Sequence, residues 1–198
     1  MGKIFYIMGK SATGKDHIYK GLLEDPTIQM KPVVLYTTRP MRQGETNGKE
    51  YFFVDTETMQ RLDFDGKIIE CRRYDTIYGP WYYFTADEGQ IDLEKGDYLA
   101  IGTPESYCKL RDYFGGKNIC AIYIETEDGI RLARALERER AQTQPKYSEM
   151  CRRYLADEQD FSEAHLQEAG IGKRFDNNGT LEACLQEIKA YIRISQSV

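Results

Sequence analysis

Near its N-terminus the chain reads Gly9-Lys10-Ser11-Ala12-Thr13-Gly14-Lys15-Asp16, which fits the pattern G-x-x-x-x-G-K of a phosphate-binding loop, or P-loop. An unbroken apolar run over 4–8 precedes it and is typical of a strand buried on both faces of a parallel sheet. An amphipathic segment over 16–23 follows and predicts a helix. In this context backbone amides and the helix N-terminus bind phosphate. We therefore predict that the eight loop residues hold a nucleotide and that Lys15 reaches its β and γ phosphates.

The last residue of the P-loop departs from the usual pattern. A Ser or Thr commonly stands there and ligates Mg²⁺ through its hydroxyl, whereas this chain has Asp16. A carboxylate is an acceptable hard ligand for Mg²⁺, although without the metal its charge would repel the phosphates. We therefore predict Asp16 as the metal ligand. The alternative interpretation, a glycine turn without function, is disfavoured by the strand and helix on either side.

The rest of the chain predicts an α/β fold with a parallel sheet flanked by helices. Apolar runs indicate further buried strands over 33–36, 98–101 and 119–124. Helical spacing is found over 104–114, 129–140 and 181–194. This alternation of strands and helices is what a P-loop core requires.

One region breaks the alternation. Between residues 39 and 85 the chain carries short aromatic strands at 51–54, 67–70 and 81–84, typical of a small mixed or antiparallel sheet. A polar stretch over 139–147 predicts a mobile flap between two helices. We therefore expect one domain over 1–198, divided into core (1–36), inserted sheet (37–85), core (86–138), lid (139–150) and core (151–198).

Composition excludes several classes of protein. With 198 residues, 41% hydrophobic and 30% charged, the chain can bury a core, which argues against disorder and against a disulfide miniprotein. A net charge of −5 argues against a nucleic-acid-binding surface, and two histidines without metal-ligand spacing argue against a histidine site. Five cysteines without a C-x-x-C pair indicate free thiols in a reducing compartment. The N-terminal apolar run is too short for a signal peptide or a membrane span, so we expect a cytoplasmic protein.

A second basic cluster follows the predicted strand over 33–36. Arg39 and Arg42 lie three residues apart and close to Tyr51. Because guanidinium groups bind phosphate through two hydrogen bonds and keep their charge, the two arginines can form a fork for a second phosphate. A solvated basic turn is the alternative, since short basic clusters are common.

The segment over 36–54, Tyr-Thr-Thr-Arg-Pro-Met-Arg-Gln-Gly-Glu-Thr-Asn-Gly-Lys-Glu-Tyr-Phe-Phe-Val, closely resembles the nucleotide-binding segment of the guanylate kinase family. The resemblance extends over nearly the whole chain. Besides the P-loop it includes Ile68-Ile69-Glu70, Tyr78-Gly79, the helix with Arg134 and Arg138, Arg153-Tyr154 and Asn178-Gly179-Thr180-Leu181. It implies a parallel-sheet core, an inserted domain that binds a nucleoside monophosphate, and a lid.

The resemblance also implies roles for individual residues. The monophosphate of the acceptor would be held by Arg39, Arg42, Tyr51 and Tyr78. Glu70 would face the acceptor base, and Asn178 would lie near the adenine of the donor, which is ATP with Mg²⁺. The arginines that close on the phosphates during transfer would be Arg134, Arg138 and Arg153, with Lys15 and Arg39 completing the catalytic set.

Three positions depart from the family pattern. Leu35, Pro80 and Gly102 stand where the family usually has a Ser, a Ser or Thr, and an Asp. Each change removes a polar side chain from the vicinity of the base or of bound metal and water. The Glu70 carboxylate remains and can accept the adjacent N–H donors of guanine, a contact that contributes about 1.5–3 kcal/mol. Phosphate binding is therefore expected to be retained while base selection is weakened.

The sequence thus predicts an ATP-dependent kinase that phosphorylates GMP or dGMP, with small nucleotides as partners and no nucleic acid or membrane. One alternative is a catalytically weak nucleotide-binding or scaffold domain, because a fold alone does not determine a function. Another is a kinase whose acceptor is not a guanine nucleotide. The sequence predicts no oligomeric state.

Overall fold

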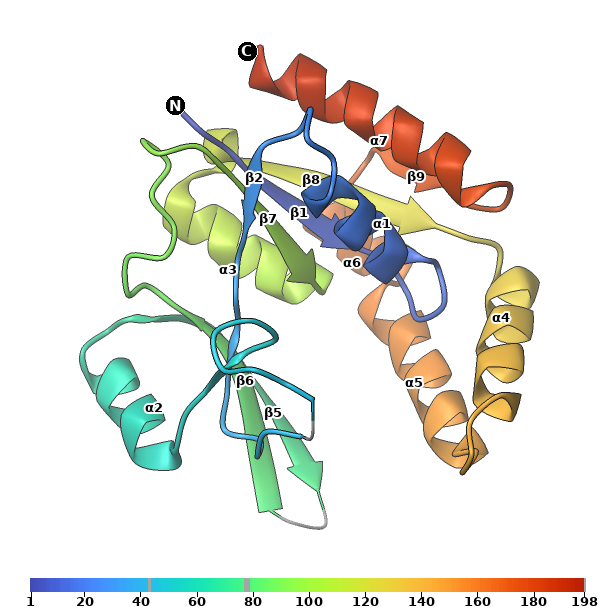
Figure 1. Ribbon diagram of the computed structural model, residues 1–198, viewed down its shortest axis with the longest axis horizontal. Helices are drawn as coiled ribbons and strands as arrows, with labels where there is room; N and C mark the ends of the chain where they lie inside the picture. Colours follow the sequence, from blue (N-terminus) through green and yellow to red (C-terminus); the bar gives the residue numbers. More distant parts are fainter. Residues whose placement is uncertain (43, 77–78, 198) are drawn as a thin grey trace.

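A five-stranded parallel sheet forms the centre of the computed structural model, which describes residues 1–42, 44–76 and 79–197 (Figure 1). The strand order is β2 (Met30–Pro32), β7 (Asp97–Gly102), β1 (Ile4–Met8), β8 (Ile119–Glu125) and β9 (Arg174–Asp176). All four pairings in this sheet are parallel. The predicted fold class is therefore confirmed.

Helices cover both faces of the parallel sheet. The side chains of Ile4, Tyr6 and Met8 lie on one face with residues of α3 and α6, whereas Phe5 and Ile7 lie on the other with residues of α1 and α7. All five β1 residues are buried, which explains why this strand is apolar without alternation. The helices are α1 (Lys15–Leu23), α2 (Thr56–Phe64), α3 (Pro104–Phe114), α4 (Asp128–Arg140), α5 (Tyr147–Asp160), α6 (Glu163–Glu168) and α7 (Leu181–Gln196), with a 3-10 turn at Gly116–Asn118. Within the described ranges no helix is both long and apolar enough to cross a bilayer.

A second, mixed sheet is built from residues between 36 and 86. Its order is β4 (Phe52–Phe53), β3 (Tyr36–Thr37), β6 (Gly79–Ala86) and β5 (Ile68–Thr76). The β3–β4 pair is parallel and the other two pairs are antiparallel. Leu62 of α2 packs with Tyr36, Phe84 and Ala86 into a small separate core. This sheet and the α4–α5 pair project in the same direction from the parallel sheet (Figure 1).

The predicted strand over 33–36 is wrong. The parallel strand ends at Pro32, and the mixed sheet begins at Tyr36. Between them the side-chain amide of Gln90 accepts the backbone N–H of Val34 at 3.0 Å and donates to its carbonyl oxygen at 3.0 Å. The apolar run is therefore a crossing between two sheets, in which a glutamine replaces a strand as hydrogen-bonding partner.

The connection between α4 and α5 is shorter than the predicted flap over 139–147. Only residues 141–146 lie outside the two helices. The buried carboxylate of Glu139 accepts the backbone N–H of Lys146 and, at 3.0 Å, the side-chain amide of Gln142. The turn is thus held by one acidic side chain at the end of α4.

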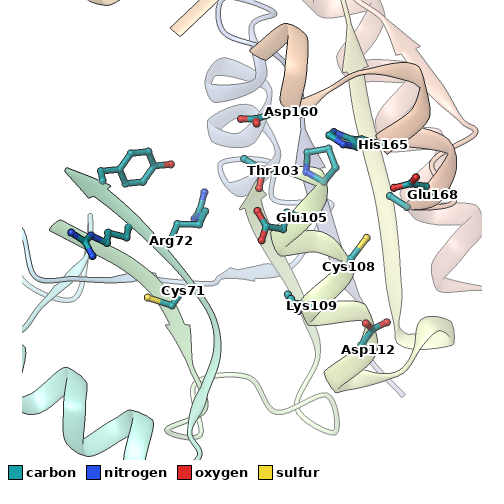
Figure 2. A pocket seen from close by; sticks show the side chains of 14 residues that line it. Cys71, Arg72, Thr103, Glu105, Cys108, Lys109, Asp112, Asp160, His165 and Glu168 are labelled. Carbon is teal, nitrogen blue, oxygen red and sulfur yellow. The ribbon is translucent and has the colours of Figure 1, made fainter. Parts of the chain in front are cut away.

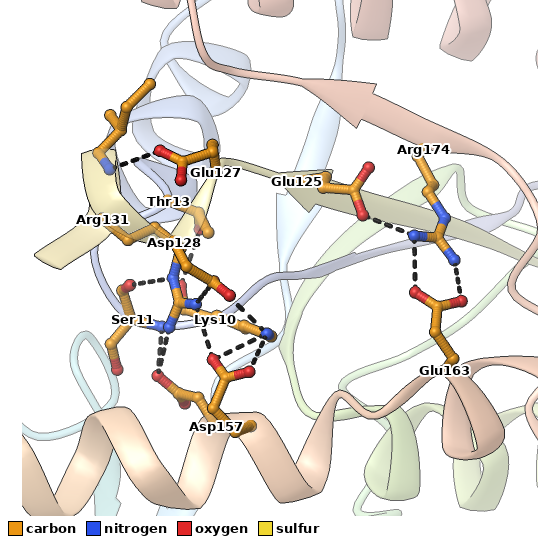
Figure 3. A network of polar contacts seen from close by, with 12 residues as sticks. Lys10, Ser11, Thr13, Glu125, Glu127, Asp128, Arg131, Asp157, Glu163 and Arg174 are labelled. Atoms are coloured by element: carbon orange, nitrogen blue, oxygen red, sulfur yellow. Dashed lines mark hydrogen bonds and ion pairs between the residues drawn. The ribbon is translucent and has the colours of Figure 1, made fainter.

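A buried arginine joins the P-loop to α4 and α5 (Figure 3). Arg131 on α4 is 0% exposed. Its Nε donates to the carbonyl oxygen of Ser11 at 3.2 Å, and its Nη1 donates to Asp128 and, at 3.0 Å, to Glu158. Asp157 on α5 lies 3.6 Å from Nη2 of Arg131 and accepts the backbone N–H of Ser11 at 2.7 Å. One guanidinium and one carboxylate therefore hold both polar backbone groups of Ser11.

Lys10 and Tyr154 complete this cluster. The Lys10 ammonium donates to both carboxylate oxygens of Glu158 at 2.8 Å, and the Arg131 guanidinium lies 4.7 Å from the centre of the Tyr154 ring. Burial alone would raise the pKa of Glu158, but hydrogen bonds from Lys10 and Arg131 hold that pKa below its ordinary value. A lowered folded-state pKa stabilises the fold above the unfolded pKa, so this contribution is lost as the pH falls.

Removing the buried guanidinium should destabilise the fold. In Arg131→Met the carboxylates of Asp157 and Glu158 lose a partner, and breaking a buried ion pair in this way costs about 3 kcal/mol. Urea unfolding followed by circular dichroism measures the change. In the control Arg73→Ala an exposed ion pair with Asp75 is lost, which should leave the midpoint nearly unchanged because such pairs contribute little. Equal midpoints for wild type and Arg131→Met would contradict this role.

Candidate active site

The P-loop lies between the carboxyl end of β1 and the first turn of α1. Ala12 has a φ of 64° and Gly14 a φ of 89°, both in the left-handed region. That conformation costs a non-glycine residue about 1 kcal/mol or more and is found where the surrounding structure enforces it. A Cβ at Gly14 would lie 2.6 Å from Nδ2 of Asn177, so only glycine fits there. The course of the loop is therefore fixed by its neighbours, and the strained Ala12 marks it as a candidate functional element.

A cavity of about 570 Å³, called here the P-loop cavity, opens beside this loop. It is lined by Ala12, Gly14, Lys15, Asp16, His17, Arg134, Glu137, Arg138, Asn177 and Leu181. Two of the three predicted lid arginines, Arg134 and Arg138, thus lie beside the predicted phosphate-binding lysine. Nη2 of Arg134 donates to the carbonyl oxygen of Asn177 at 3.1 Å, which ties α4 to the segment before α7.

The asparagine at this cavity is Asn177, whereas the sequence analysis selected Asn178. Asn177 is 2% exposed, and its Nδ2 donates to the carbonyl oxygen of Thr13 at 2.6 Å. Asn178 instead accepts the backbone N–H of Glu127 at 2.7 Å and lines a different cavity, with Lys10. The Asn-Asn pair in the sequence signals this place without showing which of the two side chains turns toward the P-loop.

A larger cavity of about 830 Å³ lies between the two sheets and is called here the inter-sheet cavity. It is lined by Lys15, Asp16, Leu35, Tyr51, Arg72, Arg73, Tyr74, Asp75, Thr76, Trp81, Tyr83, Ile101, Glu149 and Arg152. Lys15 and Asp16 line both this cavity and the P-loop cavity. Two separate spaces thus meet at the last two residues of the P-loop.

Arg39 lies under the aromatic side of the mixed sheet. It is 3% exposed, and its guanidinium donates to both oxygens of Glu45, at 2.9 and 2.8 Å. The same guanidinium lies 5.5 Å from the ring centre of Tyr51 and 5.3 Å from that of Phe53. The hydrogen bonds from Arg39 and from the backbone N–H of Arg42 lower the pKa of Glu45 to about 2.

The structure therefore brings Arg39 and Tyr51 together as predicted, with Arg42 exposed beside them. Tyr78 lies outside the described residues. Glu45 was not predicted as the partner of Arg39. The opposite charges of the two residues, six positions apart in a stretch that contains a glycine, were a signal for this pair.

Glu70 on β5 is almost fully buried, at 6% exposure. Its carboxylate accepts the hydroxyl of Thr85 at 2.9 Å and lies 3.3 Å from Nε of Arg72. Burial raises the pKa of Glu70, and the charge of Arg72 and the hydroxyl of Thr85 oppose that rise. The sequence analysis missed Arg72, which is one of three charged residues near the start of β5 and carries no motif.

The predicted lid arginine on α5 is Arg153, and its neighbour Arg152 is the one that lines a cavity. Arg152 lines the inter-sheet cavity and donates to both oxygens of Glu149 at 2.8 Å. Arg153, the predicted residue, is exposed, and its Nε lies 3.7 Å from Glu149. One residue rotates a helical side chain by about 100°, so a shift of one position is enough to change the face.

A preformed metal cage is absent from the ranges 1–42, 44–76 and 79–197, in which no three His, Cys, Asp or Glu side chains are placed to hold an ion. Magnesium in nucleotide sites is commonly held by one or two carboxylates together with substrate phosphates and water. Asp16 is exposed and stands next to Lys15 at the junction of the two cavities. Its carboxylate therefore fits an ion that arrives with a nucleotide.

Comparison with known proteins adds a sequence match. Residues 1–88 match the family model described as guanylate kinase. A guanylate kinase of Aliivibrio fischeri (strain ATCC 700601 / ES114) is 37% identical over 96 residues, which cover 48% of this chain and 45% of that relative. The matched segment thus spans less than half the length of this curated relative.

A structural comparison covers far more of the chain. A crystal structure of guanylate kinase from Anaplasma phagocytophilum matches 98% of this chain and 86% of its own, with a TM-score of 0.63 and 22% sequence identity. At this identity the likeness shows the fold alone. The chain is therefore similar to guanylate kinases in sequence over residues 1–88 and in fold over nearly its whole length.

Proposed function

We propose that this protein transfers the γ-phosphoryl group of ATP to a nucleoside monophosphate, with GMP or dGMP as the acceptor. The observation that carries the proposal is that Lys15 and Asp16 line both the P-loop cavity and the inter-sheet cavity. Phosphoryl transfer requires the donor and acceptor phosphates to meet in line beside placed cations. The match of residues 1–88 to the guanylate kinase family model supports the same reaction.

The P-loop cavity is the proposed donor site. Backbone amides of the P-loop would bind the phosphates, Lys15 would contact the β and γ groups, and Arg134 and Arg138 would stabilise charge that develops during transfer. Asp16 would hold Mg²⁺, which would neutralise phosphate charge during transfer. Asn177 would face the donor nucleotide from the segment before α7.

The inter-sheet cavity is the proposed acceptor site. Tyr51 lines it, and Arg39 lies against the Tyr51 ring with its guanidinium bound to Glu45. A phosphate dianion would compete with Glu45 for this guanidinium, while the exposed Arg42 offers a second one. Arg152 of α5 reaches the same cavity, so movement of the α4–α5 pair would bring an arginine to the phosphates and exclude water.

The five cysteines are all free thiols, which supports a cytoplasmic location as part of this proposal.

Two other functions each have one observation in their favour. A weak nucleotide-binding or scaffold domain is favoured by the pairing of Lys10 and Arg39 with carboxylates. A kinase with a non-guanine acceptor is favoured by Leu35 and Gly102, which offer no polar side chain where the resemblance leads one to expect it. Magnesium-dependent ATP binding separates the first from a kinase, and turnover across a panel of monophosphates tests the second.

Replacement of the P-loop lysine should abolish most of the transfer. In Lys15→Ala the transferring phosphate loses its nearest cation, and we expect kcat to fall about 100-fold or more. ADP release with GMP, dGMP, AMP, CMP and UMP measures it. The control Lys20→Ala changes an exposed lysine on the same helix, paired with Glu24 at 3.7 Å, and should keep wild-type kcat. A wild-type protein that releases no ADP with any acceptor would overturn the proposed function.

The carboxylate at the end of the P-loop should set the magnesium requirement. In Asp16→Asn the ion loses a charged ligand, so the half-saturating Mg²⁺ concentration should rise several-fold for both ATP binding and turnover. Asp16→Ser restores a hydroxyl ligand and should lie between the two proteins. Calorimetric titration of ATP at a series of Mg²⁺ concentrations provides a readout independent of catalysis. An unchanged requirement in Asp16→Asn would show that Asp16 does not bind the ion.

A further inference from the structure

A third cavity, of about 690 Å³, lies between β5 and the helices α3, α5 and α6 and is called here the rear cavity (Figure 2). Its lining includes Arg72 from β5, Thr103 and Glu105 at the start of α3, and Asp160 at the end of α5. Arg72 also lines the inter-sheet cavity. Its side chain therefore separates the proposed acceptor site from the rear cavity.

A β-bulge aims Arg72 and Glu70 to the same side. Ile68 pairs with Ala86 but Glu70 pairs with Thr85, so the register shifts by one residue just before Glu70. Beyond the bulge side chains alternate, which places Glu70 and Arg72 on one face of β5 and Cys71 on the other. The two inward residues have side-chain exposures of 3% and 18%, whereas Cys71 is exposed.

The last residue of β7, Gly102, cannot be replaced by a residue with a polar side chain. A Cβ at Gly102 would lie 2.2 Å from the hydroxyl of Tyr6 and 2.8 Å from Oγ of Ser106. The Tyr6 hydroxyl donates to Ser106 at 2.8 Å and is buried, so it cannot move aside. Leu35, at another departure from the family pattern, adds an apolar side chain to the inter-sheet cavity. Arg72, which lines the inter-sheet cavity and pairs with Glu70, is a charged group that can contact a base there.

Arg72 is only partly satisfied. Its Nε lies 3.3 Å from Glu70, yet within the described ranges this buried atom has no hydrogen-bond partner of acceptable geometry. A buried donor left unpaired costs about 1–3 kcal/mol. A guanidinium carries five N–H donors and no acceptor, so a ligand that satisfies it must offer acceptor atoms. Glu70 beside it requires the opposite, namely N–H donors.

We infer that Arg72 is a specificity-determining residue that donates to the keto oxygen of the acceptor base, next to the N–H group accepted by Glu70. This inference rests on the proposed function. A 6-oxopurine such as guanine or hypoxanthine presents O6 and N7 as acceptors, the pair that arginine binds with two hydrogen bonds, beside the N1–H donor. Adenine presents an amino group in place of O6 and an acceptor in place of N1–H. Adenine would therefore place a donor against Arg72, which also donates, and an acceptor against Glu70, which also accepts. The acceptor class is therefore 6-oxopurine monophosphates.

The test measures binding and turnover of GMP, IMP and AMP by Arg72→Gln and Arg72→Ala. GMP and IMP share O6, so both should lose about 10- to 100-fold in kcat/KM, mainly through KM, while AMP changes little. The control Arg61→Ala removes an exposed arginine on α2 and should match wild type. Thermal unfolding shows whether each variant is folded, and Arg72→Gln preserves side-chain length and some donor capacity if the alanine variant fails to fold.

The pH profile gives a readout that a purely structural role would not move. Glu70 faces Arg72 on its own strand, Thr85 on β6, Glu105 on α3 and Tyr6 on β1. Loss of the Arg72 charge removes the effect that opposes the raised pKa of Glu70, so the acid limb of kcat/KM for GMP should move to higher pH. Arg61→Ala should leave that limb in place.

The outcomes are distinguishable from a failure of the proposed function. Equal losses for GMP, IMP and AMP, or wild-type selectivity in both Arg72 variants, would overturn the role of Arg72 while the kinase activity stands. Binding titrations read the base preference even in a protein that transfers no phosphate. A wild-type protein that binds none of the three nucleotides would overturn both proposals together.

Discussion

The position of the phosphate-binding loop depends on the buried guanidinium of Arg131. It holds the carbonyl oxygen of Ser11 and the carboxylates of Asp128 and Glu158, while Asp157 beside it holds the N–H of Ser11. Burying a charge costs several kcal/mol unless it is paired, so the contacts of Arg131 with Ser11, Asp128 and Glu158 favour one arrangement of the loop against α4 and α5, while its Nη2 has no hydrogen-bond partner among the described residues. Arg134 and Arg138 at the P-loop cavity and Arg152 at the inter-sheet cavity come from these two helices. The same guanidinium therefore helps to place these three arginines relative to Lys15.

The same logic explains how a chain with a net charge of −5 would bind phosphates at the proposed sites. Four cations of the P-loop, the mixed sheet and α5 have carboxylate partners: Lys10 has Glu158, Arg39 has Glu45, Arg72 has Glu70 and Arg152 has Glu149. Such pairs hold long side chains in place before a ligand arrives, which lowers the entropy lost on binding. The cost is that a phosphate must compete with a carboxylate. Selectivity for a dianion over weaker anions follows from that competition.

Features that depend on neighbours in the sequence were predicted well. The P-loop, the parallel sheet and the mixed sheet follow from apolar runs and glycines, and α3 has the predicted bounds because a capping box at Thr103 and Gly115 mark its ends. The prediction of a strand over 33–36 was wrong, because an apolar run can also form a crossing between two sheets. Arg152 and Asn177 line the cavities next in sequence to the predicted Arg153 and Asn178, because neither helix phase nor a side-chain direction in a loop is encoded by the motif. Arg131 and Arg72 were missed altogether, because burial of a single charge depends on segments far away in the chain.

The base pocket shows how one apolar-core residue can redirect a specificity site. The Tyr6 hydroxyl fills the space that a side chain at position 102 would need, so the end of β7 is closed to polar residues as long as that tyrosine stays in the core. In our proposal the contacts with the acceptor base then come from β5, where the bulge places Glu70 and Arg72 side by side. Without a nucleotide the two charges satisfy each other only in part. A base that offers an acceptor to Arg72 and a donor to Glu70 completes both, whereas a base with the reverse pattern leaves the buried Nε of Arg72 unsatisfied and places an acceptor against Glu70. Because a buried donor left unsatisfied costs more than a hydrogen bond contributes, rejection of the wrong base is the larger part of this selectivity.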